Sequence, residues 1–228
     1  GTPRAVATAQ VSPANQIEVP LFNPAAGYAT YVLPAAFVLI LQQTMMMGLA
    51  LAATRRGPLP GHAVWRLLGR AGAWLAIYVG LLPIYLIVLP VLYGLPILGG
   101  PGALMMLGLP FLLAAGFLAQ LVAALFRQGE VVQVVMLAMG LPFFFLSGFA
   151  WPVEAIPVHL NALAQLIPST AAIDGLVRVT QMVATLPQIA PILWHLWALA
   201  GGLGLIVLAV EIRRAARSTP TTNERPAL

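Results

Sequence analysis

Residues 103–126 read ALMMLGLPFLLAAGFLAQLVAALF and contain no Asp, Glu, Lys or Arg. A helix needs about 20 such residues to cross a bilayer, and this run is long enough. Four more runs share its length and its lack of charge: Tyr31–Ala53, Ala71–Tyr93, Val131–Phe149 and Ile192–Val210. The runs are apolar on every face instead of alternating every second residue, which argues against a transmembrane β-barrel. We therefore predict an all-α, polytopic membrane helix bundle with five transmembrane helices.

The composition of the 228-residue chain supports this class. It is 61% hydrophobic and 7% charged, whereas a soluble domain carries about 25% charged residues. The chain also has no Cys and no Lys, which excludes thiolate metal sites, a Lys Schiff base and the Lys of a Walker A loop. We expect no enzymatic activity and no catalytic residues. We also expect no metal site, because His62, His159 and His195 lack partners at metal-ligand spacing.

The arginines predict how the chain is oriented. Nine of the eleven arginines fall in three segments that lie on one side if all five runs cross, whereas Arg4 and Arg178 fall on the other. By the positive-inside rule the arginine-rich side is cytoplasmic, so we expect the N-terminus outside and the C-terminus inside. An external N-terminus without a signal peptide suggests that an upstream signal-anchor helix is missing. The arginines flank apolar runs instead of forming a basic stripe, so we expect no nucleic-acid partner.

The segment Gly61–Gly72 reads GHAVWRLLGRAG and is predicted to form a short cytoplasmic interfacial helix. Its apolar residues share one helical face beside Trp65, and Arg66 and Arg70 can reach lipid head groups. Two interpretations remain open. The segment is either the start of a spanning helix whose arginines reach the interface, or a contact for a cytoplasmic partner.

The stretch Ala150–Pro191 is predicted to form an external re-entrant helical hairpin. It is too polar to cross and too apolar for a free loop, and five prolines divide it. Short helices are expected at Asn161–Ile167 and Ala171–Ala184, with Ser169 or Thr170 capping the second.

Four residues are singled out as candidate site residues of this external hairpin: Trp151, Glu154, Asp174 and Arg178. Asp174 and Arg178 stand four residues apart and are expected to pair on one helical face. If the hairpin crossed the membrane, each of these two charges would cost about 2.5–3.5 kcal/mol at the centre of a helix. This cost favours a segment that turns back without crossing.

Polar residues inside the spans are candidates for a substrate path: Gln42, Gln43, Thr44, Gln120 and Gln133. Two interpretations remain open for them. They can make hydrogen bonds between helices, or they can line a cavity for an amphipathic substrate, since burying polar groups in lipid costs free energy.

Three stretches of the chain resemble the membrane subunit of an ABC-2 type exporter, a permease of bacterial drug and polymer efflux. The most specific is LSGFAWPVEAIP at residues 146–157, a span end followed by a Pro-bounded external turn. The others are FNP at residues 22–24 with Tyr28 and Pro34, and LIPST at residues 166–170 with Asp174, Gly175 and Arg178. The resemblance covers roughly Phe22 to Arg217.

The resemblance implies six spans, of which the first and most of an external domain are absent from this chain. Residues 1–30 are then an external tail, the remnant of an extracytoplasmic domain. Residues 31–217 form the transmembrane permease domain, and residues 218–228 form a cytoplasmic tail. The family often has an acidic segment with Gly and Thr after its second span, whereas residues 54–60 here read TRRGPLP.

The resemblance also implies partners. Family members work as dimers of permease subunits, homodimeric or heterodimeric, with cytoplasmic ABC ATPase subunits. This chain then binds no cofactor, and ATP and Mg act through the ATPase partner. The ATPases move the helix that corresponds to Gly61–Gly72, so His62, Trp65, Arg66 and Arg70 are candidate coupling residues. A periplasmic adaptor is a further expectation from Gram-negative members.

We therefore expect a multi-pass permease subunit of an ATP-driven ABC exporter in the bacterial inner membrane. Its substrate is not identified by the sequence and could be drug-like, a lipid or a polymer. An alternative is a non-transporting membrane scaffold or assembly protein with the same bundle. A secondary transporter is less favoured, because coupling would call for ionisable residues inside the membrane and the five runs offer only His195, near the external interface.

Overall fold

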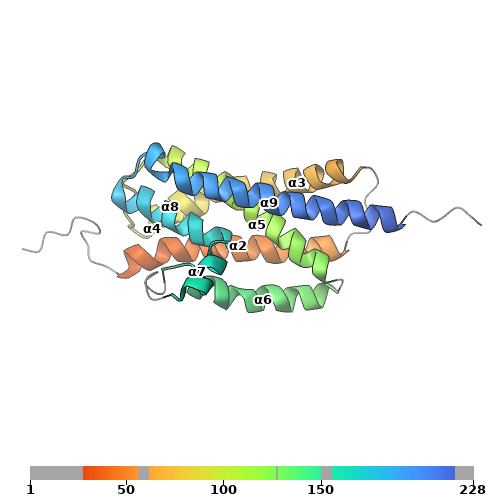
Figure 1. Cartoon of the computed structure of the whole chain (residues 1–228). Helices are drawn as coiled ribbons and strands as arrows, with labels where there is room; N and C mark the ends of the chain where they lie inside the picture. Colours follow the sequence, from red (N-terminus) through yellow and green to blue (C-terminus); the bar gives the residue numbers. More distant parts are fainter. Residues whose placement is uncertain (1–27, 56–61, 127, 150–155, 219–228) are drawn as a thin grey trace, which may run out of the picture.

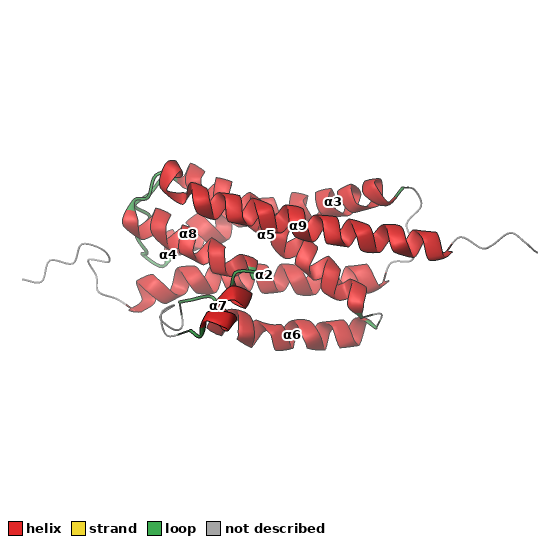
Figure 2. Cartoon of the chain, viewed as in Figure 1, coloured by secondary structure: helices red, strands yellow, loops and turns green. Residues whose placement is uncertain are grey.

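The computed structural model describes residues 28–55, 62–126, 128–149 and 156–218. Every regular element within these residues is a helix (Figure 2). The long helices lie side by side along one axis and form an elongated bundle (Figure 1). Five helical segments of the described residues are long and apolar enough to cross a membrane. The all-α, polytopic bundle predicted from the sequence is confirmed.

Each predicted run lies largely within helical residues, although α3 and α9 extend well beyond their runs. In chain order they are α2 (Tyr28–Arg55), α3 (Ala63–Pro83), the π-helical turn η1 (Ile84–Val88), α4 (Leu89–Leu92), α5 (Pro101–Leu125), α6 (Gly129–Leu146), α7 (Val158–Ala164), α8 (Pro168–Met182) and α9 (Leu186–Ser218). The segments α3, η1 and α4 together form one candidate span, Ala63–Leu92. The π-helical turn precedes Pro90, whose ring nitrogen cannot donate the regular helical hydrogen bond, so the bonding pattern changes there.

The spanning helices alternate in direction. Figure 1 shows α2, α5 and α9 running one way and α3 and α6 running the other. One end of the bundle, where α3 begins and α9 finishes, carries Arg66, Arg70, Arg213 and Arg214, and we call it the basic end. The opposite end, beside α7 and α8, is called the hairpin end. This alternation is the arrangement that the predicted orientation requires.

Helix α5 lies at the centre of the bundle and contacts α2, α3, α8 and α9. Its side chain Phe111 is only 1% exposed. Two glycines of α5 let α3 approach closely, because a Cβ atom on Gly108 would lie 2.1 Å from Leu82 and one on Gly116 would lie 2.2 Å from Trp74. Small residues at such crossings are typical of helix packing in membranes.

The structure corrects the prediction of a separate interfacial helix at Gly61–Gly72. Gly61 lies outside the described residues, and from Ala63 onward the segment is the first part of the continuous helix α3. The reason is a buried stripe that runs without a break along one face of α3, at residues Ala63, Leu67, Ala71 and Trp74. Because this face packs on the bundle, the exposed glycines Gly69 and Gly72 do not end the helix. The span therefore begins earlier than the predicted Ala71.

Helices α7 and α8 form the predicted pair of short helices and meet at an angle of 85°. Near its start, α8 contacts the middle of α2, where Gln42 Nε2 donates a hydrogen bond to Ser169 Oγ at 3.1 Å. Near its end, Gln181 Nε2 donates to the carbonyl oxygen of Thr30, in the first turn of α2, at 2.7 Å. Helix α8 therefore lies antiparallel to α2 and occupies only the hairpin half of the bundle.

The predicted N-cap of α8 is wrong. The helix begins at Pro168 after the extended residue Ile167, and no side chain caps it. Proline suits this first position, because its missing N–H would have had no partner in the helix. Ser169 lies inside the helix instead, where its hydroxyl accepts the hydrogen bond from Gln42.

Candidate coupling and ligand sites

Three charged side chains join α3 to α9 at the basic end. Arg70 Nη2 lies 2.5 Å from Glu211 Oε1, and Arg66 Nη2 lies 3.6 Å from Glu211 Oε2. The side chains of Arg66, Arg70 and Glu211 are 15%, 21% and 16% exposed. Arg66 and Arg70 stand one helical turn apart on α3, so both guanidinium groups reach the same carboxylate on α9. We call these three residues the arginine–glutamate cluster.

The other two predicted coupling residues lie at the start of α3. His62 precedes the helix, and its Nδ1 accepts a hydrogen bond from the backbone nitrogen of Val64 at 3.4 Å. Trp65 is 73% exposed. The structure thus brings Arg66 and Arg70 together on Glu211 and leaves Trp65 as the large exposed side chain beside them.

Glu211 is not among the coupling residues predicted from the sequence. It follows directly after the last predicted run, which ends at Val210, and it stands before Arg213 and Arg214 in a segment interpreted only as a basic flank. A single carboxylate among arginines at the end of an apolar run was the available signal. Its partners are 141 residues away from it in the chain, and sequence spacing does not reveal such a contact.

A further arginine ties α9 to α5 at the same end. Arg214 Nη2 donates a hydrogen bond to the carbonyl oxygen of Ala124 at 2.5 Å. Ala124 is in the last turn of α5, where carbonyl groups have no partner within the helix and a cation is favourable. The end of α9 is therefore held to both α3 and α5.

Three of the predicted substrate-path residues make hydrogen bonds between helices, which is the first of the two interpretations given for them. Gln42 bonds to Ser169 on α8, Gln43 Nε2 donates to the carbonyl oxygen of Met136 on α6 at 2.6 Å, and Gln133 Nε2 donates to that of Met47 on α2 at 2.9 Å. Thr44 Oγ1 donates to the carbonyl oxygen of Ile40 within its own helix at 2.8 Å. A role of these residues in a substrate path stays a prediction.

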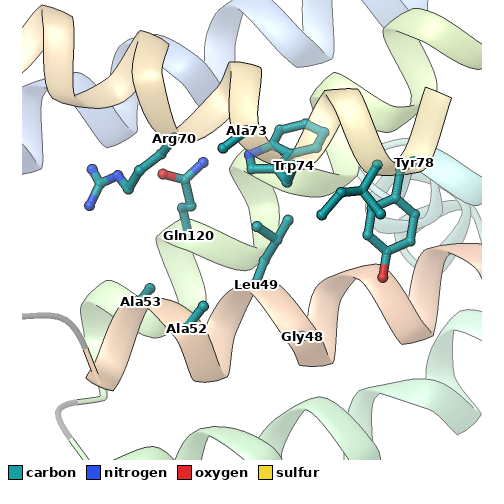
Figure 3. Close-up of a pocket in the computed structure, with 10 residues that line it drawn as sticks. Gly48, Leu49, Ala52, Ala53, Arg70, Ala73, Trp74, Tyr78 and Gln120 are labelled. Carbon is teal, nitrogen blue, oxygen red and sulfur yellow. The ribbon is translucent and has the colours of Figure 1, made fainter. Parts of the chain in front are cut away.

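Gln120 differs from these four residues. It is 6% exposed, and within the described residues neither its Nε2 nor its Oε1 has a hydrogen-bond partner. It lines a cavity of about 330 Å³ between α2, α3 and α5, together with Arg70, Trp74, Gly48, Ala52 and Tyr78. In Figure 3 the Gln120 amide lies between the Arg70 side chain and the Trp74 ring. We call this space the Gln120 cavity.

A second cavity, of about 560 Å³, lies at the hairpin end between α6, α7, α8 and α9. The predicted pair is present on its wall, with Arg178 Nε donating to Asp174 Oδ1 at 2.7 Å, and both side chains are about half exposed. The hydrogen bond from Arg178 to Asp174 raises the pKa of the guanidinium. His195 also lines this cavity, and its Nε2 lies 2.9 Å from the carbonyl oxygen of Gln165. Trp151 and Glu154 lie outside the described residues.

The bundle of apolar spans, with a basic end that joins α3 to α9, defines a polytopic membrane protein. Residues 3–210 match the family model described as ABC-2 family transporter protein. The chain belongs to this family and is a membrane permease of an ABC transporter, which confirms the resemblance seen in its sequence. The family implies association with an ABC ATPase and a membrane partner, and no cofactor on this chain. No curated protein and no solved structure matches the chain.

Proposed function

We propose that the chain is the permease subunit of an ATP-driven exporter, which moves an amphipathic or polymeric substrate out across the bacterial inner membrane. A separate cytoplasmic ATPase supplies the energy, because a chain without Lys has no Walker A loop. Two permease subunits form the transporter, and the C-terminus is cytoplasmic. The grouping of the described arginines other than Arg178 at one end of the bundle supports this orientation.

The exposed Trp65 beside the arginine–glutamate cluster is the observation that carries this proposal. It is a large aromatic side chain, 73% exposed, at the first turn of a spanning helix. Aromatic side chains are enriched at protein interfaces. We assign the ATPase contact to Trp65 and His62, while Arg66 and Arg70 hold α3 to α9 behind that contact.

The packing of α3 suggests how a push at Trp65 reaches the bundle. The helix runs unbroken from Ala63 to Pro83, so its first turn moves with the rest. Glu211 attaches it to α9, and Trp74 packs against Gly116 of α5. A displacement of the first turn is therefore shared among three helices, and ATP-driven movement of the ATPases can change the cavities between them.

The α7–α8 hairpin is the external, re-entrant part of this proposal. Helix α8 reaches only the middle of α2, and the exposed Asp174–Arg178 pair lies on its surface. A segment that stops half way carries these charges near the external interface. The larger cavity beside it then faces the side to which the substrate is released.

The coupling proposal is tested by substituting Trp65 alone. Arg66 is left unchanged, because it belongs to the arginine–glutamate cluster and its loss would also weaken the fold. Trp65→Ala should lower transport-linked ATP hydrolysis and copurification of the ATPase at least several-fold, with an unchanged amount of permease in the membrane. The readout is ATP hydrolysis and substrate efflux in vesicles that contain the permease and the ABC ATPase with which it copurifies.

Trp194 offers a matched control, because it is 74% exposed and lies on α9 in the hairpin half. Trp194→Ala should leave ATP hydrolysis at the level of the unmodified chain. Normal coupling in Trp65→Ala, or equal losses in both variants, would overturn the assignment of the contact. An ATPase that binds but never moves a substrate would instead support a scaffold.

A further inference from the structure

The Gln120 cavity holds three polar side chains whose N–H groups have no acceptor within the described residues. They are the Nε2 group of Gln120, the Nε1 group of Trp74 and the Nε group of Arg70. Gln120 and Trp74 are 6% and 4% exposed, so bulk water does not replace the missing partners. Native proteins satisfy nearly all buried polar groups, because a buried donor without an acceptor is costly. Three such donors stand beside a single unpartnered acceptor, Gln120 Oε1, within the described residues. This excess of donors on one cavity indicates a ligand that brings acceptor atoms.

The charges around the cavity favour an acidic ligand. A small adjoining cavity, of about 40 Å³, shares Ala53, Arg70 and Gln120 with the Gln120 cavity and is also lined by Glu211 and Arg214. The two adjoining cavities are thus lined by two arginines, Arg70 and Arg214, and by one carboxylate, Glu211. This excess of positive charge stabilises an anion more than a neutral head group.

The rest of the lining is apolar. Leu49 and Ile77 belong to the cavity wall, and Ile77 is 63% exposed on the outer surface of α3. The cavity is therefore bordered by a residue that faces the surroundings of the bundle. An aliphatic chain that lies along Leu49 and Ile77 would bury apolar surface while its head group meets the donors.

We propose that the Gln120 cavity binds an amphiphile with an acidic, oxygen-bearing head group. The head-group oxygens accept hydrogen bonds from Trp74, Gln120 and Arg70, and the aliphatic part lies along the apolar wall toward Ile77. Two sources share this chemistry: an anionic membrane lipid and a smaller acidic amphiphile. Binding at this site does not depend on the coupling proposal, because residues of α2, α3 and α5 of this chain supply the donors and the apolar wall.

The fluorescence of Trp74 reports directly on the cavity, because bromine atoms quench an indole that they contact. The other four tryptophans are replaced with Phe in the full chain, which is then reconstituted in phosphatidylcholine bilayers. One arm adds brominated phosphatidylglycerol, a second adds brominated phosphatidylcholine, and a third adds dibromostearic acid. We expect the acidic probes to quench at roughly tenfold lower concentrations than the neutral one. This is about the gain in affinity that one hydrogen bond to a charged group gives.

The first and third arms separate the two sources. Strong quenching by phosphatidylglycerol identifies a membrane lipid, and strong quenching by dibromostearic acid alone identifies a smaller amphiphile. Equal quenching by acidic and neutral lipids, or no quenching by any probe, would overturn the proposal.

Gln120→Leu sharpens this test, with Gln133→Leu on α6 as the matched control. Leu replaces the buried amide with an apolar group of similar size, so the ligand-free chain should be at least as stable as before. Its binding of the acidic probe should fall roughly tenfold, whereas Gln133→Leu should keep that binding. A purely structural role of Gln120 would predict lower stability and unchanged binding, which is the opposite pair of results.

Native mass spectrometry of the unmodified chain supplies a measurement that needs no tryptophan substitutions. The unmodified chain should retain phosphatidylglycerol or stearic acid in preference to phosphatidylcholine, and Gln120→Leu should lose that preference. Retention that is the same for both chains would overturn the proposal.

Discussion

The two ends of the bundle each carry charged pairs, but the pairs are built differently. At the basic end, Arg66 and Arg70 of α3 meet Glu211 of α9, and all three side chains are 15–21% exposed. At the hairpin end, Asp174 and Arg178 pair within one helix, with side chains that are 49% and 48% exposed. The arginine–glutamate cluster joins two helices that are distant in the chain, whereas the Asp174–Arg178 pair lies on the surface of a single helix. Position and burial, rather than the presence of an ion pair, therefore decide how much a charged residue contributes to stability.

Loss of Glu211 should have the largest effect on stability. Glu211→Gln removes the carboxylate charge that both largely buried guanidinium groups contact, and removing one partner of a buried pair costs about 3–5 kcal/mol. Because these side chains keep some exposure, we expect a loss of about 2–3 kcal/mol. Chemical unfolding of the purified chain in detergent measures it.

A double substitution tests whether the effect comes from the cluster itself. Glu211→Gln combined with Arg70→Gln removes both members of the closer pair, so the combined loss should be smaller than the sum of the two single losses. Additive losses would show that other contacts hold α3 to α9. The charged residues at the two ends would then not differ in how they contribute to stability.

At the hairpin end, close packing should contribute more to stability than charge does. A Cβ atom on Gly99 would lie 2.2 Å from the backbone oxygen of Val179, which holds the segment before α5 against α8. Gly99→Ala should therefore cost about 1–3 kcal/mol, because the backbone itself has to shift. The neighbouring Gly100 has no atom within 4 Å of its Cβ position, so Gly100→Ala is a matched control with a small effect. Thermal unfolding of both variants gives the difference, and equal midpoints would contradict the close contact.

The sequence predicts the spans well because apolar length is a local property. Residues 103–126 contain enough information to place α5 within a few residues. The spacing of Asp174 and Arg178 likewise predicts their pairing, which the structure confirms. These predictions succeed because each depends on residues that are close together in the chain.

Contacts between distant segments could not be predicted in the same way. Glu211 is recognised as a partner only when α3 and α9 are side by side, and Gln120 is distinguished from the other polar residues only by what surrounds it in the bundle. The separate helix expected at Gly61–Gly72 failed for a related reason, since burial of one face of α3 outweighs its glycines. Tertiary packing, not local propensity, decides these features.

One substitution at the hairpin end should stabilise the protein. Val183 ends α8 with φ of 53°, in the left-handed region that is unfavourable for a β-branched side chain. Val183→Gly removes this strain, and the side chain is already 57% exposed, so little packing is lost. Part of this stabilisation is lost, because glycine has more conformational freedom in the unfolded chain. We expect a net increase of about 0.5–1 kcal/mol, and a lower unfolding midpoint would contradict the assigned strain.

The smallest effect is expected at the exposed pair of α8. Asp174→Asn removes a surface ion pair between residues four apart, and such pairs contribute about 0.3–0.5 kcal/mol. Because both side chains are about half exposed, added salt screens their attraction, so the difference from the unmodified chain should vanish at high ionic strength. Glu211→Gln should keep most of its effect under the same conditions, since its partners are largely buried. Unfolding of both variants at low and high salt makes this comparison in one series. A salt-independent loss of more than about 1 kcal/mol in Asp174→Asn, beyond the usual range for exposed pairs, would show that the hairpin charges support the bundle as the arginine–glutamate cluster does.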